Sequence, residues 1–244
     1  MGELLAVLSG KGGTGKTSVC AGLATALAEA GLDVLCIDCD IGLRNLDISL
    51  GMQQISALSF TDVSQGGYSL EQAAVHPDYP KLHFLTAPIN CVAENIDTDM
   101  FLTMLAQARQ RYRYIFLDAP AGIDAGFQLA ARFADRVLLV TGSDPAAVRD
   151  ASRAGEILEL MGKTDVRLIV NRINPKMVSA MDLTIDDVMD RAGLPLMGIV
   201  PEDPNVTLAA AFGRPVLKHT KKGAAAACRR IAKRIQGLSV AIPL

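Results

Sequence analysis

At positions 10 to 17 the chain reads Gly10-Lys11-Gly12-Gly13-Thr14-Gly15-Lys16-Thr17, just after the apolar run Leu4–Leu8. This segment fits the pattern G-x-x-x-x-G-K-[ST], a phosphate-binding loop that joins a strand to a helix. Its glycines let backbone N–H groups turn toward phosphate groups, and the start of the helix adds positive potential. In such a loop Lys16 reaches the β- and γ-phosphates, and the Thr17 hydroxyl binds Mg²⁺. The segment therefore predicts a nucleoside triphosphate site.

The same segment also fits the dinucleotide-binding pattern G-x-G-x-x-G, through its glycines at positions 10, 12 and 15. Asp38 lies 23 residues beyond the last of these, about where a dinucleotide-binding fold holds the ribose. Two features favour the triphosphate. A dehydrogenase has no use for Lys16-Thr17 at the start of the helix, whereas a triphosphate site needs both. Asp118 also ends the apolar run 115–117, where a carboxylate opposite the loop holds the metal through water.

Short apolar runs alternate with helical patterns along the chain. The predicted strands are Leu4–Leu8, Val34–Ile37, Leu82–Leu85, Tyr114–Leu117, Val137–Val140, Leu168–Val170 and Met197–Val200. Most are continuously apolar, which is typical of parallel strands covered on both faces. Helices are predicted from the row Val19, Leu23 and Leu27, after Asp97 or Thr98, and from Asp144-Pro145 to Gly162. We predict an α/β fold with a doubly wound, mostly parallel sheet and helices on both faces. We expect one domain over residues 1–237 and a short tail over residues 238–244.

Composition excludes several classes of protein. Half of the 244 residues are hydrophobic and the net charge is only −2, which excludes a disordered chain. The apolar runs are far shorter than the roughly 20 residues that span a bilayer, and the N-terminus does not resemble a signal peptide. Five cysteines at irregular spacings do not make a disulfide framework, so we expect a cytoplasmic protein. Cys36 and Cys39 are spaced like a metal or redox motif, but in a strand they point to opposite faces, and we expect them to be buried.

The charge is unevenly distributed. No acidic residue follows Asp203, whereas residues 1–203 hold all 26 Asp and Glu against 16 of the 24 Lys and Arg, a balance of −10. A basic end on an acidic body favours contact with a polyanion, either lipid or nucleic acid. A solvated last helix is the simpler alternative. Residues 228–238 place an apolar stripe opposite four basic residues, a pattern shared by interfacial helices and by helices packed on a sheet.

Lys11 directly follows the first glycine, and in this it resembles the signature lysine of the deviant Walker A loop in the MinD/ParA family of P-loop ATPases. The segment 38–47, Asp38-Cys39-Asp40-Ile41-Gly42-Leu43-Arg44-Asn45-Leu46-Asp47, resembles the first switch of the MinD-type, septum-site-determining branch. Asp118-Ala119-Pro120-Ala121-Gly122-Ile123 is similar to its second switch. The segments 147–151, 170–172 and 200–203 are also similar, and the resemblance extends to about residue 236.

The resemblance implies a role for each matching residue. Lys16 and the loop amides hold the phosphates of ATP, and Thr17 binds Mg²⁺ with help from Asp38 and Asp118. Asp40 positions the attacking water, and Asn45 senses the γ-phosphate. Lys11 reaches across a dimer interface to the partner's phosphates, and Asp144 holds this lysine in the resting monomer. The expected walls of the adenine and ribose pocket are Asn171, Arg172, Pro201 and Asp203.

The resemblance also implies a biological role and partners. It implies an ATP-dependent homodimer that hydrolyses ATP to position cell-division machinery at the membrane, with regulatory partners of the MinC and MinE type. We expect a partner face on the helix after Asp144, through Arg149, Asp150 and Arg153, with a solvated charged face as the alternative. We expect weak association with anionic membranes, peripheral on the inner face. Residues 238–244 do not match the basic amphipathic helix with bulky apolar residues that usually ends the MinD branch, so a ParA-like segregation ATPase that binds DNA stays open.

Overall fold

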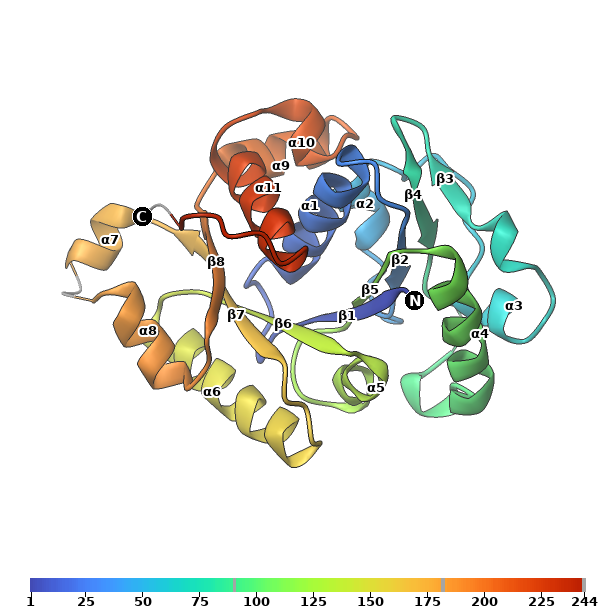
Figure 1. Ribbon diagram of the computed structural model, residues 1–244, viewed down its shortest axis with the longest axis horizontal. Helices are drawn as coiled ribbons and strands as arrows, with labels where there is room; N and C mark the ends of the chain where they lie inside the picture. The colour runs from blue at the N-terminus through green and yellow to red at the C-terminus, as the bar shows by residue number, and fades with distance from the viewer. Residues whose placement is uncertain (90, 181–182, 243–244) are drawn as a thin grey trace.

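The computed structural model describes residues 1–89, 91–180 and 183–242. Its centre is one sheet with the strand order β3-β4-β2-β5-β1-β6-β7-β8 (Figure 1). Within the described residues the strands are β1 (Glu3–Leu8), β2 (Val34–Asp38), β3 (Ala74–His76), β4 (Tyr79–Leu85), β5 (Tyr114–Asp118), β6 (Arg136–Thr141), β7 (Val166–Ile173) and β8 (Leu196–Pro201). All pairings are parallel except that between β3 and β4.

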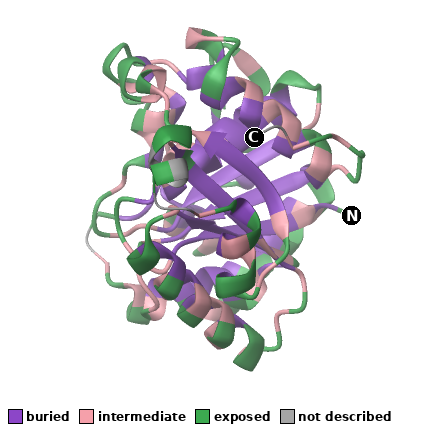
Figure 2. Ribbon diagram, turned by 90° about the vertical axis from the view of Figure 1, so that its left-hand side faces the viewer, coloured by how far each residue is buried: buried purple, intermediate pink, exposed green. Residues whose placement is uncertain are grey.

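Helices cover both faces of this sheet. The first half of the chain contributes α1 (Lys16–Glu29), α2 (Leu46–Leu50), α3 (Phe60–Ser64), the 3₁₀ turns η1 (Leu70–Gln72) and η2 (Ala93–Asn95), and α4 (Thr98–Arg111). The second half contributes α5 (Ala125–Phe133), α6 (Pro145–Leu160), α7 (Pro175–Ala180), α8 (Ile185–Ala192), α9 (Pro204–Ala211), α10 (Val216–His219) and α11 (Gly223–Ile235). Figure 2 shows the buried sheet between exposed helical surfaces.

The continuous apolar strands divide their side chains between two cores. In β1, Leu4, Ala6 and Leu8 face a core built with α3, α4, α5, α6 and α8. Leu5 and Val7 face a second core built with α1, α2, α10 and α11. Because neighbouring residues of a strand point to opposite faces, a run with no polar position is what two covered faces require. The predicted doubly wound sheet is confirmed, as are all seven predicted strands.

Helices α4 and α6 begin directly after the N-cap residues that the sequence predicted for them. The carboxylate of Asp97 accepts hydrogen bonds from the backbone N–H groups of Asp99 and Met100 at the start of α4. Asp144 accepts from Ala147 N–H at 2.9 Å, and Pro145 occupies the first turn of α6. A side-chain oxygen that accepts from these free N–H groups stabilises a helix start by about 1 kcal/mol.

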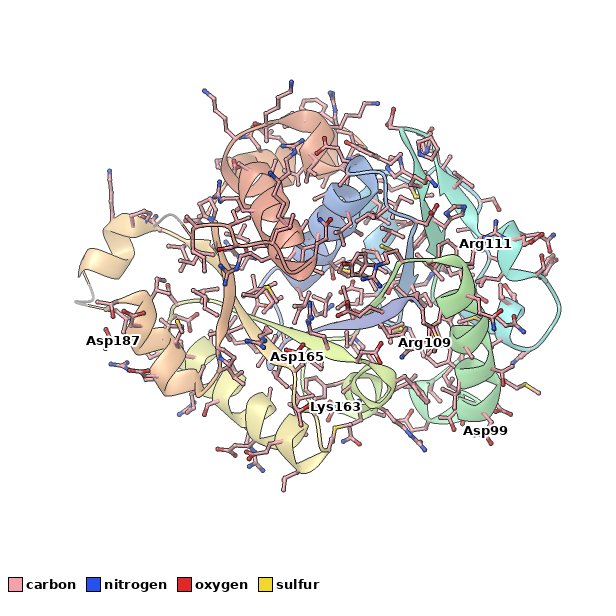
Figure 3. The ribbon with its side chains drawn as sticks, viewed as in Figure 1. Asp99, Arg109, Arg111, Lys163, Asp165 and Asp187 are labelled. Carbon is pink, nitrogen blue, oxygen red and sulfur yellow. The ribbon has the colours of Figure 1, made fainter. Side chains whose placement is uncertain are left out.

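Ion pairs link the strand starts at the end of the sheet opposite the glycine-rich loop. Arg109 pairs with Asp135 at 2.7 Å, and Arg136 pairs with Asp165 at 2.7 Å. Figure 3 labels Arg109, Lys163 and Asp165 among the side chains drawn. Lys163 donates to the carbonyl oxygens of Arg132 and Ala134. These contacts stabilise the end of the sheet where the strands begin. The glycine-rich loop lies at the other end, at the carboxyl ends of the strands.

The last helix, α11, is part of the core. Its residues Cys228, Ile231, Ala232 and Ile235 are buried against β8 and α1. The apolar stripe of α11 thus packs against the sheet. Of the two interpretations of this pattern, a helix packed on the sheet is confirmed. The described part of the tail, residues 238–242, follows α11, while Pro243 and Leu244 lie outside the described residues.

Candidate functional site

The glycine-rich loop lies between β1 and α1, as the sequence predicted. Gly13 and Gly15 have φ values of 80° and 81°, a left-handed conformation that favours glycine. The N-terminus of α1 begins at Lys16, directly after this turn. A Cβ atom at position 10 would lie 2.4 Å from the carbonyl oxygen of Asp150, so α6 packs directly against the loop. The glycine turn thus places the loop directly before the start of α1, with α6 packed against it.

Lys16 and Asp118 form a buried ion pair beneath the loop. The Nζ atom lies 2.8 Å from Asp118 Oδ1 and 3.2 Å from the Thr17 hydroxyl, and the two charged side chains are 6% and 1% exposed. Burial alone would lower the pKa of Lys16, but the Asp118 carboxylate raises the pKa above its usual value. The ammonium group is therefore charged and is held between Asp118 and Thr17.

The carboxyl ends of two neighbouring strands bring Asp38 and Asp118 together. These residues are register partners on β2 and β5. Burial first, and then the Asp118 carboxylate, raise the pKa of Asp38 to about 7. Asp38 also accepts hydrogen bonds from Asp40 N–H at 2.9 Å and from Leu46 N–H at 3.2 Å, so it organises the segment that follows β2.

That segment leads from Asp40 to α2. The Asp40 side chain is partly exposed and accepts from Leu43 N–H at 3.2 Å. Asn45 precedes α2 but makes no side-chain cap there, and its side chain is exposed. Arg44 has a φ of 51° and donates to the Thr86 hydroxyl, a contact that no sequence pattern predicted. Asp40 and Asn45 thus lie on the segment between β2 and α2, with Asp40 partly exposed and Asn45 exposed.

Lys11 lies on the outer side of the loop. Its Nζ atom is 3.0 Å from Asp144 Oδ1, and the two side chains are partly exposed. The same carboxylate caps α6, and this hydrogen bond and Lys11 lower the pKa of Asp144 despite partial burial. The resemblance implied this Lys11–Asp144 contact, and the structure contains it. The contact joins the loop to the start of α6.

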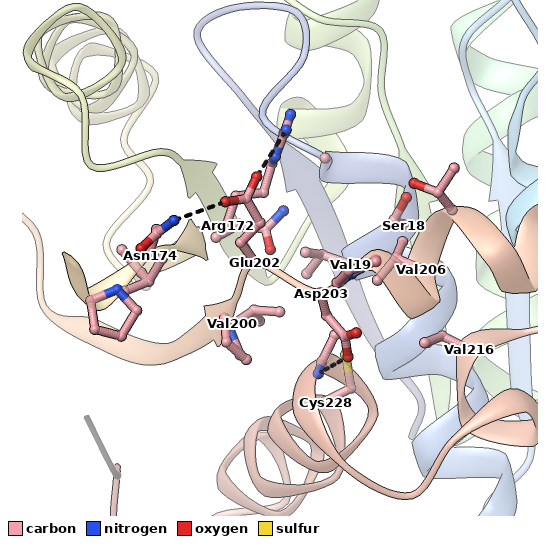
Figure 4. A pocket seen from close by; sticks show the side chains of 18 residues that line it. Ser18, Val19, Arg172, Asn174, Val200, Glu202, Asp203, Val206, Val216 and Cys228 are labelled. Carbon is pink, nitrogen blue, oxygen red and sulfur yellow. Dashed lines mark hydrogen bonds and ion pairs between the residues drawn. The ribbon is translucent and has the colours of Figure 1, made fainter. Parts of the chain in front are cut away.

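A cavity of about 680 Å³ opens beside the loop (Figure 4). It is lined by Gly15, Asn171, Arg172, Pro201 and Asp203, among others, which places the expected base and ribose residues around one space. Asn171 donates from Nδ2 to the Thr14 carbonyl at 2.7 Å, which ties β7 to the loop. The volume is within the range of small-molecule sites.

Arg172 and Asp203 also make hydrogen bonds within the protein that the sequence did not predict. Arg172 has a φ of 57° and donates to the Gly13 carbonyl and to Glu202 at 3.4 Å. Asp203 caps α9 through Asn205 N–H, and its other oxygen accepts from Ala224 N–H at 2.9 Å. Both oxygens of Asp203 are therefore engaged with backbone, and its structural role is to join β8, α9 and α11 at the wall of the cavity.

Several residues of this wall carry no motif that predicts them. They are Ser18, Val19, Asn174, Glu202, Val206, Thr207, Val216, Ala224 and Cys228. Ser18 directly follows the loop, so its position near the site was the easiest of these to predict. The others come from four helices and from the residues that follow β7 and β8, which only the folded chain brings together.

The predicted partner residues lie along α6. Arg149 and Arg153 are exposed and Asp150 is half-buried. Arg153 pairs with Glu156 at 2.7 Å, one turn along the same helix. The face is polar and accessible, and it begins beside the phosphate loop.

The residues fit a triphosphate and a divalent cation. The hydroxyl of Thr14 and Asp118 Oδ2 are buried and have no hydrogen-bond partner within the described part of the chain. In the same residues no cluster of three His, Cys, Asp or Glu could hold a metal by itself. This suits Mg²⁺, which is usually bound by one or two protein oxygens together with phosphates and water. Thr17, Asp38 and Asp118 are the groups that would hold it.

Two further expectations concern cysteines and membranes. Cys36 and Cys39 are buried in different cores on opposite faces of the sheet, as expected for their spacing. Across residues 1–89, 91–180 and 183–242, no helix has the length and apolar character needed to cross a bilayer.

Comparison with known proteins places the chain among relatives. Residues 5–216 match the model of the CobQ/CobB/MinD/ParA nucleotide-binding domain. The septum site-determining protein MinD of Synechocystis sp. is 35% identical over 243 residues, which cover 98% of this chain and 91% of that protein. The MinC:MinD cell division protein complex of Aquifex aeolicus contains a chain with 34% identity and a TM-score of 0.91, covering 99% of this chain and 98% of that one. A Pyrococcus horikoshii MinD complexed with Mg-ADP has 26% identity and a TM-score of 0.81, with 96% of both chains covered.

The likenesses to these relatives cover 96–99% of the chain. They agree with the chemistry of the site, which provides for ATP and Mg²⁺ as the reacting nucleotide and its cation. The chain belongs to the MinD family of septum site-determining, Mg²⁺-dependent ATPases.

Proposed function

We propose that the residues gathered at the loop hydrolyse ATP and that this reaction switches the chain between a monomer and a homodimer. The buried Lys16–Asp118 pair is the observation that carries the proposal. Before nucleotide binds, the Asp118 carboxylate is the anion that pairs with the charged Lys16. The triphosphate would then replace Asp118 as the partner of Lys16 and leave the carboxylate free to face the cation.

Each further residue has a task that follows from its position. The loop amides and Lys16 bind the phosphate oxygens, and Thr17, Asp38 and Asp118 hold Mg²⁺ directly or through water. Bound Mg²⁺ neutralises charge that develops on the transferring phosphoryl group. Asp40 accepts a proton from, or orients, the attacking water, and Asn45 contacts the γ-phosphate at the start of α2. Asn171, Arg172, Pro201 and Asp203 surround the base and ribose.

Lys11 supports the dimeric state. Its pair with Asp144 is partly exposed, and such pairs contribute little to stability, on the order of 0–1 kcal/mol. Lys11 can therefore leave Asp144 at small cost and reach the phosphates of a second copy. A lysine provided by the partner makes hydrolysis depend on dimerisation, because the developing charge is neutralised only when both copies are present.

The positioning of cell division needs a protein partner. A relative has been solved as a MinC:MinD cell division protein complex, and a MinC-type regulator is accordingly proposed for this chain. A MinE-type regulator is proposed on the resemblance alone. The polar face of α6, with Arg149, Asp150 and Arg153, is the proposed contact for either.

The proposed function also includes weak, reversible association with the anionic inner face of the cell membrane. It is supported by the basic residues after Asp203 and by the absence of acidic residues there. The same charges favour DNA as the alternative polyanion, which would make the chain a ParA-like segregation ATPase. The similarity of the first switch to the MinD branch favours the membrane.

The test measures nucleotide binding and phosphate release separately. Lys16→Ala is expected to abolish nucleotide binding or turnover, whereas Asp40→Ala is expected to bind ATP and leave it unhydrolysed. Equilibrium binding of a fluorescent ATP analogue and a phosphate-release assay with Mg²⁺ distinguish the two. Wild-type turnover by the Asp40 variant would refute the role of Asp40, and unchanged binding by the Lys16 variant would refute the site.

A further inference from the structure

A second cavity, of about 320 Å³, lies at the end of the sheet where the strands begin, opposite the glycine-rich loop. Three arginines line it: Arg136 at the start of β6, Arg167 near the start of β7 and Arg234 in the last turn of α11. We call this space the arginine cavity. The groups proposed for ATP and Mg²⁺ lie at the other end of the sheet, so the nucleotide does not account for three cations that share one cavity.

The fold directs these three side chains to one side of the sheet. Leu138 and Ile169 belong to the core that contains α11. Arg136 and Arg167 precede them by two positions on the same strands. Because residues two apart in a strand share a face, both arginines point to the side that α11 covers (Figure 1). Arg234 reaches the same space from α11, which packs on β8.

The carboxylates beside the cavity serve Arg136 first. Arg136 pairs with Asp165 at 2.7 Å and with Glu3 at 3.3 Å. It also donates to the carbonyl oxygen of Ile235, at the end of α11, at 3.1 Å. The other oxygen of Asp165 accepts from Nε of Arg167 at 2.6 Å. Arg136 is therefore fully paired, whereas Arg167 shares its carboxylate with a second arginine.

Arg234 and Arg167 keep donors that no carboxylate of the described chain engages. The terminal nitrogens of Arg234 donate to the carbonyl oxygens of Val240 at 3.0 Å and Leu196 at 3.4 Å. Its Nε is buried and has no hydrogen-bond partner among the described residues. A buried donor without an acceptor costs free energy, and in native proteins it calls for an explanation such as an ion. Within the same residues, the one hydrogen bond of Arg167 runs from its Nε, so both of its terminal nitrogens can bind an anion.

We propose that the arginine cavity binds the phosphate group of a small phosphate monoester. Arg167 and Arg234 approach the ligand from two different elements, and the exposed Ser239 hydroxyl provides a third donor. A tetrahedral phosphate accepts hydrogen bonds from several directions, whereas a planar carboxylate is matched by one guanidinium in its own plane. Leu196 and Leu238 line the same cavity, which favours a ligand whose other end is apolar.

The arginine cavity is separate from the nucleotide site, although the same elements line both. Strand β7 contributes Arg167 to the arginine cavity and Asn171 to the nucleotide cavity. Helix α11 likewise contributes Arg234 to the first and Cys228 to the second. A phosphate monoester bound between the arginines is therefore a second ligand, and its binding has to be measured while the nucleotide site is filled.

The experiment is calorimetric titration of the full chain with phenyl phosphate, inorganic phosphate and benzoate, after saturation with a non-hydrolysable ATP analogue and Mg²⁺. We expect saturable binding of phenyl phosphate, weaker binding of inorganic phosphate and the weakest binding of benzoate. Arg167→Gln should weaken the binding of phenyl phosphate about tenfold or more, because a hydrogen bond to a charged group contributes that much. The matched control is Arg191→Gln, an exposed arginine on α8, which should bind like wild type.

Thermal unfolding of the same samples checks the fold. Arg167→Gln should melt close to wild type, since Asp165 keeps its pair with Arg136. Ser239→Ala, at an exposed position, tests the site independently and should weaken binding about fivefold.

Three outcomes would contradict the proposal. Absence of saturable binding of phenyl phosphate, or equal affinity in wild type and Arg167→Gln, would overturn the site. Benzoate bound as tightly as phenyl phosphate would overturn the assignment to phosphate. These measurements require neither ATP hydrolysis nor dimerisation, so either result leaves the proposed ATPase switch to its own tests.

Discussion

Two lysines of the phosphate loop each face a carboxylate, but their surroundings differ. Lys16 and Asp118 are almost fully buried, whereas Lys11 and Asp144 are 35% and 54% exposed. Removing one partner of a buried pair leaves an uncompensated charge away from water, whereas an exposed lysine is solvated by water. Lys16 is thus fixed in place, and Lys11 is free to change partners.

This difference predicts unequal losses of stability. Without nucleotide, Asp118→Ala should lower the free energy of unfolding by about 3–5 kcal/mol, because Lys16 is left buried and unpaired. Asp144→Ala should cost only about 1 kcal/mol, chiefly through the lost cap of α6. Urea unfolding of both variants at neutral pH measures the two values. Equal losses would contradict the assignment of the two environments.

His76 predicts a pH dependence. Its Nε2 lies 2.8 Å from the Leu50 carbonyl oxygen, which can only accept, and its Nδ1 accepts from Asp78 N–H, so the buried ring is neutral. Burial lowers the pKa of His76 below its usual value. The unfolded chain therefore binds a proton first as the pH falls below about 6.5, and stability decreases until the lowered folded-state pKa is reached.

The measurement is the difference between wild type and His76→Gln in urea unfolding from pH 7.5 to 5. Wild type should lose more stability than the variant in the window below about 6.5. A comparison by difference is needed because burial also lowers the pKa of His83, and because Asp38, with its pKa raised to about 7, acts with the opposite sign. Parallel curves for wild type and variant would exclude a contribution from His76.

Some of the site could be predicted residue by residue, and some could not. Lys16, Thr17 and Asp118 were accessible because the glycine spacing and the end of an apolar strand fix their positions by local rules. The left-handed backbone of Arg172 and the pocket residues Thr207 and Cys228 were not. They depend on which distant elements meet at the cavity, and no local pattern encodes that.

Among the helices, α6 combines a buried face with a polar face beside the loop. Ala147, Val148, Ala151, Ala154 and Leu158 are buried, so charges on the other side can change without disturbing the core. Arg153→Glu, at an exposed position of this face, should therefore leave basal ATPase activity unchanged and abolish its stimulation by a regulatory partner. Glu159→Arg, at the far end of the same helix, is the control and should be stimulated normally. An Arg153 variant that responds normally to an identified partner would place the contact elsewhere.

The packing of α11 on β8 predicts a steric effect. A Cβ atom on Gly198 would lie 2.4 Å from Cγ1 of Ile231, closer than non-bonded atoms can approach. Gly198→Ala should therefore cost about 1–3 kcal/mol of stability. Gly155→Ala, on α6, meets Leu194 at an ordinary 3.4 Å and should be neutral or stabilising. Thermal unfolding of both variants compares them, and a neutral Gly198→Ala would show that α11 is loosely packed.

The seven long strands could be predicted because each contains a short segment of mainly apolar residues, which in most of them is an unbroken run. The short strand β3 was missed, since its three residues pair antiparallel with β4 and include the buried His76. The role of α11 could not be decided from its amphipathic pattern. A helix that packs on a sheet and a helix that lies on lipid have the same periodicity, and only the tertiary contacts of Ile231 and Ile235 distinguish them.

Across the whole molecule, the parallel topology places every proposed catalytic group at one end of the sheet. The loop follows β1, Asp38 ends β2 and Asp118 ends β5, and these three strands are neighbours in the order β2-β5-β1. Because the carboxyl ends of parallel strands meet at one edge, residues more than 100 positions apart in the sequence become contacts. Lys11 lies at the outer side of this site, partly exposed and facing away from the core.

The accessible position of Lys11 predicts an oligomeric switch. With hydrolysis blocked by Asp40→Ala, ATP should remain bound and light scattering should report a dimer, whereas ADP should leave a monomer. Adding Lys11→Ala should remove the dimer, since no lysine then neutralises the phosphates of the opposite copy. Lys176→Ala, an exposed lysine on α7, is the matched control and should dimerise normally. An oligomer of constant size under ATP, ADP and no nucleotide would contradict the switch, because dimerisation would then not depend on the γ-phosphate that distinguishes ATP from ADP.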